Sequence, residues 1–358
     1  MAAKGFRVFD GDGHVYEDDD ELAQHYEGKY KGQKRFKAFG IFPSLDGWAR
    51  GFILSRDDKT RKYTHTNAAI WGEVLNELNA EGSVLYPTAA LAFGLMQDVE
   101  FATATATAYN NWLEERYTKL DDRLYGVGIM AIQDPKAAVK ELIRCATKRK
   151  NFVAMFLPTV TALGRTYGDP YFDPIYEAAQ KYKIPLVLHG GPSRGMGFDH
   201  WNFRPFCKVH TLEHPVPLMI QLTDVIFSGV FDRFPKLRMG FMEGGCSWVP
   251  FMMDRLDYEY GSVLGLSIRG KLKKKRPSQY ISEGDNFWVS FELGENALKY
   301  TIDAMGSERI LYASDYPHEP TEEELLEELP EFIANPAYSL AVKKNILYKN
   351  IKRFYNIK

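Results

Sequence analysis

Cysteine is scarce in this sequence, and its cysteines are not spaced for metal binding or cross-linking. Cys145, Cys207 and Cys246 are the only three in 358 residues. They form neither a CxxC pair nor a disulfide framework, which fits a reducing compartment. No apolar run approaches the length of a bilayer span, and the N-terminal apolar run is very short before a polar loop begins. We therefore expect structural cysteines and a cytoplasmic protein.

The sequence also has no large excess of charge of either sign. The formal net charge is −2, from 45 basic and 47 acidic residues. Such a balance gives no electrostatic reason to expect nucleic acid or an anionic membrane as a partner. The one basic run, from Lys271 to Arg276, is interpreted as a solvated loop. A small-molecule substrate is the expected partner, with no nucleic acid and no membrane.

Internal repeats, low-complexity tracts and Pro/Gly/Ser-rich linkers are absent, which predicts one domain over residues 1–358. GDGH is a poor match to GxGxxG, so a doubly wound open sheet is disfavoured. Eight short apolar runs instead alternate with helical segments such as Phe101–Lys119, Pro135–Thr147 and Pro170–Tyr182. The predicted strands are Phe6–Phe9, Val84–Tyr86, Tyr125–Ile132, Phe152–Phe156, Pro185–Leu188, Leu237–Met242, Phe287–Phe291 and Ile310–Tyr312. This order predicts an α/β fold, a (β/α)8 TIM barrel with long active-site loops after strands one and five.

Acidic and histidine residues follow five of the eight predicted strands, at the end where such barrels carry their catalytic groups. They are Asp10, Asp12 and His14, then His189, Glu243 and Glu292, and finally Asp315 and His318. A charged group directly after an apolar strand costs several kcal/mol unless it is paired or binds a metal. Imidazole combined with carboxylate suits Zn, Mn or Fe.

Each of these residues also has an ordinary structural interpretation. Asp12 could be a turn residue, and His14 could be a hydrogen-bonded loop histidine. Asp315 could cap a helix, but the nearest predicted helix begins around Thr321, which is too far along the chain. Their joint position at the strand ends of one barrel favours a metal site. For His200, His210 and His214, in the long connection after strand five, substrate contact and loop structure are both open.

Several longer motifs follow one another in a specific order: FDGDGH, VLYPT, YNNWL, LVLHGG, FDRFPKLRMGFMEGG, RILYASDYPH and NIKRFY. Through most of its length the sequence thereby resembles the amidohydrolase-related family, in the branch that includes aminocarboxymuconate semialdehyde decarboxylase and resorcylate decarboxylase. The resemblance implies that Asp12, His14, His189 and Asp315 hold a divalent metal. Two departures stand out: Asp12 replaces the first histidine of an HxH motif, and Glu243 stands where the family usually ends strand six with histidine.

The leading hypothesis is a metal-dependent hydrolase or non-oxidative decarboxylase (carboxy-lyase) that acts on a small, carboxylated or aromatic substrate through a metal-activated water. In this hypothesis Asp315 binds metal and shuttles a proton, His189 is a metal ligand within the catalytic set, and Glu243 is the base or orients the water. The predicted substrate-binding residues are Arg194, Arg204, Trp201 and His318, of which the arginines would hold a carboxylate.

Two alternatives come from other classes of protein. Glu243, Glu292 and His318 could ligate a second ion, which would make the protein a dinuclear iron or iron/manganese oxygenase. It could also be a non-catalytic barrel subunit of a hetero-oligomer, although such a subunit has no physical need for converging buried carboxylates. We expect a homo-oligomer, a dimer or higher, or an assembly that includes a paralogous subunit.

Overall fold

The computed structural model describes residues 5–32, 40–45, 66–192, 196, 206–318 and 322–358. Within them, eight parallel strands pair with their neighbours in chain order, from the first to the eighth. The strands are β1 (Val8–His14), β2 (Ala80–Tyr86), β3 (Leu124–Gly128), β4 (Phe152–Pro158), β5 (Leu186–His189), β6 (Met239–Met242), β7 (Phe287–Glu292) and β8 (Ile310–Ala313). Their residues are almost all buried, as expected for a parallel sheet that is covered by helices.

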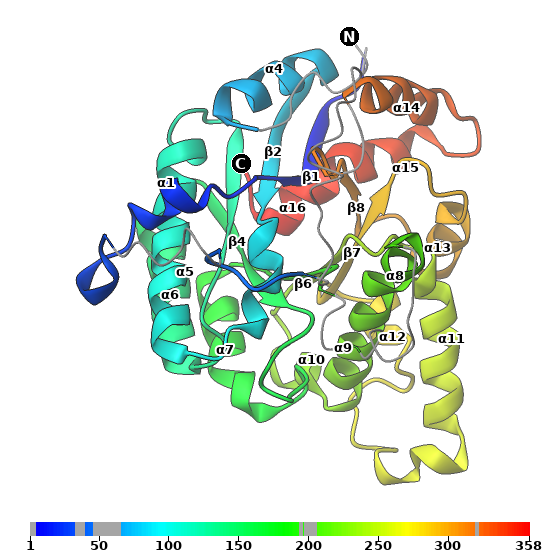
Figure 1. Cartoon of the computed structure of the whole chain (residues 1–358). Helices are drawn as coiled ribbons and strands as arrows, with labels where there is room; N and C mark the ends of the chain where they lie inside the picture. The colour runs from blue at the N-terminus through cyan, green and yellow to red at the C-terminus, as the bar shows by residue number, and fades with distance from the viewer. Residues whose placement is uncertain (1–4, 33–39, 46–65, 193–195, 197–205, 319–321) are drawn as a thin grey trace.

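The first and last strands lie against each other, and hydrogen bonds between β1 and the segment directly after β8 close the sheet into a barrel. The backbone N–H of His14 donates to the carbonyl of Tyr316 at 2.8 Å, and that of Asp315 donates to the carbonyl of Asp12 at 2.9 Å. The Asp10 side chain crosses the same seam to Ser314. The predicted (β/α)8 barrel is confirmed (Figure 1).

Helices connect the strands and surround the barrel (Figure 1). The α-helices are α1 (Asp19–Ala23), α4 (Ala68–Leu78), α5 (Val99–Leu113), α6 (Pro135–Lys148), α7 (Asp173–Tyr182), α8 (Phe206–Glu213), α9 (Pro215–Phe227), α10 (Val230–Arg233), α11 (Trp248–Gly261), α12 (Gln279–Ser282), α13 (Leu298–Met305), α14 (Glu322–Ala334), α15 (Leu340–Lys344) and α16 (Asn350–Tyr355). Shorter 3₁₀ segments are η1 (Gly28–Tyr30), η2 (Ala89–Leu95), η4 (Pro170–Phe172) and η6 (Val263–Ser267), and π turns are η3 (Glu114–Thr118) and η7 (Asn345–Lys349). Asn67, Asp98 and Asp134 cap α4, α5 and α6 through side-chain oxygens that accept first-turn N–H groups.

The largest correction to the predicted elements concerns the first strand, which was expected to end at Phe9 and runs to His14. A side chain at Gly11 would meet the carbonyl of Tyr312 at 2.8 Å, and one at Gly13 would meet the Trp71 ring. The glycines thus permit close packing within a strand, where the sequence suggested a turn. Because alternate residues of a strand share a face, Asp12 and His14 project together.

Other bounds shift less. The third strand ends at Gly128 and does not reach Ile132. The helix predicted over Phe101–Lys119 is α-helical only to Leu113 and then continues as a π turn, and the helix predicted from Pro170 begins as a 3₁₀ turn. Among the residues that the structure describes, no helix combines the length and the apolar character needed to cross a bilayer.

Candidate metal centre

Four side chains, from two strands and the segment after β8, meet at the carboxyl end of the barrel. The Nε2 atoms of His14 and His189 are 3.1 Å apart. Asp12 Oδ1 lies 3.7 Å from the first and 3.5 Å from the second, and Asp315 Oδ1 is 3.2 Å from His14 Nε2. Ligand atoms bound to one ion at about 2.1 Å lie about 3.0–3.4 Å from each other when their bond angles are 90–109°. The ligand atoms of Asp12, His14 and His189 therefore have nearly the spacing of one coordination sphere. Asp315 approaches the shared His14 and belongs to a second group of ligand atoms, with Glu243 and His318.

Both histidines are oriented by groups that accept a hydrogen bond at their other nitrogen. His14 Nδ1 is 2.9 Å from the carbonyl oxygen of Pro87. His189 Nδ1 is 2.8 Å from the carbonyl oxygen of Gly190 and 2.9 Å from Glu243 Oε2. In the neutral rings Nδ1 therefore carries the hydrogen, and the Nε2 lone pairs face each other. Histidines that ligate a metal are held in this way.

The carboxylates of the cluster are buried with little to neutralise them. Asp12 is fully buried and Asp315 is 5% exposed. Among the described residues, no hydrogen-bond partner is found for either carboxylate oxygen of Asp12 or for Oδ1 of Asp315. Burial raises the pKa of Asp12 to about 6, although His189 opposes this shift. Buried carboxylate oxygens of this kind need a cation, and the residues present fit a divalent metal.

His189 responds to the same carboxylates. Burial disfavours its charged form, but Glu243 and Asp12 together raise its pKa well above the ordinary value. A proton on His189 would neutralise the negative charge of Glu243 and Asp12, and a divalent ion at the Nε2 atoms of the two histidines would do the same. Metal binding should displace that proton.

Glu243 and Asp315 hold an unusual backbone conformation directly after their strands. Their φ angles are +51° and +53°, in the left-handed region that residues other than glycine seldom occupy. Such strain persists where the surrounding structure enforces it, often at functional sites. Here the strained residue stands directly after β6 in one case and shortly after β8 in the other, and the side chains of both residues reach the cluster.

Asp10 supports the centre, and the sequence assigned it no role beyond its place in the motif. One oxygen of its carboxylate accepts the N–H groups of Asp12 (3.2 Å) and Ser314 (3.0 Å). The other accepts the hydroxyls of Ser83 (2.6 Å) and Ser314 (2.9 Å). The alternation of Asp10 with Asp12 and His14 was the only signal that could have identified it.

A cavity of about 500 Å³ adjoins the candidate ligands. Its walls include His210, His214, Trp248, Met219, Glu243, Glu292 and Asp315. Two of the three histidines left open by the sequence, His210 and His214, therefore face the candidate active site, and the third, His200, lies outside the described residues. His214 Nδ1 is 3.8 Å from Glu243 Oε2, and burial lowers the pKa of His214 to about 4.

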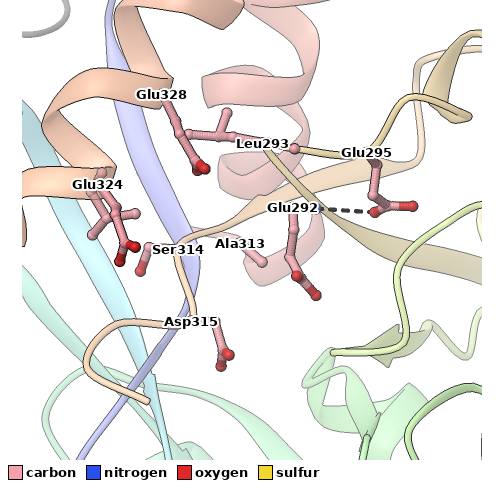
Figure 2. Close-up of a pocket in the computed structure, with 10 residues that line it drawn as sticks. Glu292, Leu293, Glu295, Ala313, Ser314, Asp315, Glu324 and Glu328 are labelled. Atoms are coloured by element: carbon pink, nitrogen blue, oxygen red, sulfur yellow. Dashed lines mark hydrogen bonds between the residues drawn. The ribbon is translucent and has the colours of Figure 1, made fainter. Parts of the chain in front are cut away.

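A second cavity, of about 300 Å³, lies beside the first and is strongly acidic (Figure 2). Glu292, the last residue of β7, and Glu295, three residues later, line it together with Asp315, Glu324 and Glu328. The Glu295 carboxylate accepts the N–H of Glu292 at 3.1 Å and so orders the segment after β7. Glu292 lines both cavities, but it does not join the described groups whose ligand atoms lie within 4.8 Å of one another.

The remaining predicted site residues divide into two sets. His318 lies in the centre, with its ring stacked on that of His14 at 3.7 Å between centroids. Arg194, Arg204 and Trp201 lie outside the described residues, so their predicted substrate contacts stay predictions.

Residues 81–357 match the family model described as amidohydrolase. The chain is similar to a 2-amino-3-carboxymuconate-6-semialdehyde decarboxylase of Dictyostelium discoideum, at 26% identity over 278 residues, which cover 75% of this chain and 71% of that protein. It is also similar to a gamma-resorcylate decarboxylase of Polaromonas sp., at 26% identity over 294 residues, which cover 75% of this chain and 81% of that protein.

Solved structures show the same barrel. A 5-carboxyvanillate decarboxylase from Sphingomonas paucimobilis superposes with a TM-score of 0.76 and 24% identity over 99% of this chain and 100% of that one. A 5-carboxyvanillate decarboxylase from Novosphingobium aromaticivorans has a TM-score of 0.77 and 20% identity over 100% of this chain and 98% of that one. The latter was crystallised with manganese and 4-hydroxy-3-methoxy-5-nitrobenzoic acid. The present chain has a His/Asp/Glu cluster that is able to bind a metal.

Proposed function

The chain belongs to the amidohydrolase family, and on that premise we propose that it is a divalent-metal-dependent, non-oxidative decarboxylase of a small aromatic or conjugated carboxylic acid. The observation that carries the proposal is the convergence of the His14 and His189 Nε2 atoms with Asp12 and Asp315 oxygens at the barrel mouth. This convergence adjoins a cavity of about 500 Å³, which is a suitable size for a small ligand. The names of the relatives supply the reaction class.

The ion would be held by Asp12, His14, His189 and Asp315, and its chemistry would be to polarise a substrate oxygen and lower the pKa of bound water. Loss of carbon dioxide breaks one C–C bond and leaves its electron pair on carbon, which must then take up a proton. Asp315 is the proposed proton carrier, because His318 Nδ1 lies 3.5 Å from its Oδ1 and can resupply it.

Glu243 has a different place in this scheme. Its Oε2 contacts His189 Nδ1 at 2.9 Å, and its side chain also lines the 500 Å³ cavity. We propose that Glu243 orients His189 and a group that binds in the cavity. Glu243→Gln should therefore retain the metal ion proposed above and lose most turnover. The control is Glu331→Gln, at an exposed position of α14, which should behave like the wild type. Unchanged turnover in Glu243→Gln would show that its charge has no catalytic role.

The reaction class is tested with the protein reconstituted with Mn²⁺ or Zn²⁺ and a panel of hydroxylated benzoic acids. Decarboxylation should release carbon dioxide and, in D₂O, place deuterium on the vacated carbon. The same protein should be assayed on esters and amides of these acids, because an activated water at this centre would also serve hydrolysis. Hydrolysis without carbon dioxide release would overturn the decarboxylase assignment in favour of a hydrolase.

One observation favours a second candidate, the dinuclear oxygenase. His14, Glu243, Asp315 and His318 form a further group of ligand atoms within 4.8 Å of one another, next to the group of Asp12, His14 and His189. Carboxylate-rich sites with imidazole suit iron and manganese. Substrate-dependent oxygen uptake by protein loaded with iron would support this candidate, and its absence during carbon dioxide release would reject it.

A further inference from the structure

The carboxylate of Glu17, three residues after His14, binds the segment that follows β2. Its Oε1 accepts the backbone N–H groups of Thr88 at 3.2 Å and Ala90 at 3.0 Å, and its Oε2 accepts that of Ala89 at 2.9 Å. These groups are donors at the start of η2, which find no acceptor within the helix itself. Glu17 therefore caps η2 from a position at least 71 residues away in the sequence.

Two further hydrogen bonds join the same segment to the end of β1. The N–H of Val15 donates to the carbonyl oxygen of Tyr86 at 3.0 Å, and the Thr88 hydroxyl donates to the carbonyl oxygen of Val15 at 2.5 Å. The Thr88 hydroxyl also lies 2.6 Å from His318 Nε2. Pro87, between Tyr86 and Thr88, is thus fixed from both sides.

The carbonyl group of Pro87 orients His14. Its oxygen lies 2.9 Å from His14 Nδ1, and because a carbonyl oxygen can only accept, Nδ1 carries the hydrogen of the neutral ring. The Nε2 lone pair, 3.1 Å from His189 Nε2, is left for a metal ion. A shift of Pro87 would therefore turn the imidazole of His14 or remove the acceptor that fixes its tautomer.

We propose that Glu17 is a positioning residue of the metal centre, because it fixes the backbone next to Pro87 and so holds the carbonyl group that orients His14. The proposal rests on the metal centre of the proposed function. Without the carboxylate, the N–H groups that follow Pro87 would lose their acceptor. Ala90 is fully buried, so water cannot replace the carboxylate there, and the segment would have to move to satisfy its donors.

The first test observes the His14 ring directly, by nuclear magnetic resonance of metal-free protein that carries ¹⁵N-labelled histidine. The wild type should show a slowly exchanging Nδ1–H signal of His14, which is assigned by its absence in His14→Gln. Glu17→Gln keeps the size of the side chain but replaces one acceptor oxygen with a donor NH₂ group. In this variant the His14 signal should shift, and its hydrogen should exchange faster with water.

The second test measures the Mn²⁺ affinity of the whole protein by equilibrium dialysis. Glu17→Gln should bind Mn²⁺ about 10-fold more weakly than the wild type, which is the lower end of the effect of groups that orient a ligand, because Glu17 acts through Pro87. If Glu17→Gln fails to fold, Glu17→Asp takes its place in both tests, since it keeps the charge but withdraws the oxygens from the three N–H groups.

The matched control is Asp18→Asn, which removes the same charge one position along the chain. The Asp18 carboxylate is exposed and caps α1 by accepting the N–H of Glu21 at 2.9 Å. Asp18→Asn should therefore have the wild-type His14 signal and the wild-type Mn²⁺ affinity.

An unchanged His14 signal or a wild-type Mn²⁺ affinity in Glu17→Gln would overturn the proposal. Equal losses in Asp18→Asn would overturn it too, because the effect would then be one of net charge. Failure of the proposed function gives a different result. Protein that shows the expected difference between wild type and Glu17→Gln, but releases no carbon dioxide from any acid of the panel, would refute the reaction alone.

Discussion

Replacing Asp10 with alanine would remove the side chain that joins the first and last strands of the barrel. The carboxylate accepts two backbone N–H groups, from Asp12 and Ser314, and two serine hydroxyls, from Ser83 and Ser314. Asp10 is only 1% exposed, so water does not compete for these donors in the folded protein. All four hydrogen bonds are lost in Asp10→Ala.

The cost can be estimated from the donors that are left behind. The hydroxyls can rotate, but the N–H groups of Asp12 and Ser314 are fixed by the backbone. Each buried donor without a partner costs about 1–3 kcal/mol, so Asp10→Ala should lower the free energy of unfolding by about 2–6 kcal/mol. In Asp10→Asn one oxygen remains, and because both N–H groups bond the same oxygen, Oδ1, both can be kept. Burial raises the pKa of Asp10, so removing its charge should cost less than removing the acceptor.

Urea unfolding monitored by circular dichroism, with metal removed, measures this difference directly. Asp10→Ala should be clearly less stable than Asp10→Asn, and it should bind the first metal at least 10-fold more weakly because the Asp12 and Ser314 backbone would shift. A stability of Asp10→Ala within 0.5 kcal/mol of the wild type, taken as roughly the range of ordinary surface substitutions, would refute the reasoning. So would an Asp10→Asn variant that is as unstable as Asp10→Ala.

Three further predictions follow from the same geometry. His189→Ala should remain folded by circular dichroism but lose bound metal and turnover, and full metal occupancy would rule out its ligand role. Gly190→Ala should lower stability by about 1–3 kcal/mol, because the added methyl would lie 2.6 Å from the Glu243 carbonyl oxygen; Gly261→Ala, which meets nothing within 4 Å, should not. In metal-free protein, the pKa of His318 of about 9 exceeds the unfolded value of about 6.5, so its stabilisation is complete below pH 6.5 and is lost as pH rises through 9. The stability difference between wild type and His318→Gln should shrink by on the order of 3 kcal/mol over that range, and a constant difference in urea unfolding would contradict the assignment.

The sequence was sufficient for the barrel because eight apolar runs, each followed by helical periodicity, leave few other topologies. It misplaced the end of β1, since Gly11 and Gly13 have the composition of a turn but serve close packing in a strand. That packing depends on Tyr312 and Trp71, whose proximity is a property of the tertiary structure.

The meeting of Asp12, His14, His189 and Asp315 at one end of the barrel could be predicted because strand ends converge in a barrel whatever the side chains are, whereas their role as metal ligands stays a prediction. The supporting contacts could not, since Thr88 and His318 are 230 positions apart and Asp10 and Ser314 are 304 apart. No local pattern records such pairs. The predictions of a single domain, of a homo-oligomer and of a cytoplasmic protein stay predictions.

The seam between β1 and β8 has a consequence for how the protein is made. Asp12 and His14 emerge from the ribosome early, whereas Asp315 is translated near the end of the chain. A nascent or truncated chain that lacks β8 and the residues after it therefore has neither the closing strand nor Asp315, the last of the proposed ligands. Because metal binding contributes its free energy only to the conformation that contains the whole site, the ion would favour complete chains over unfinished ones. Metal occupancy would thus report that synthesis of the barrel has reached its final strand.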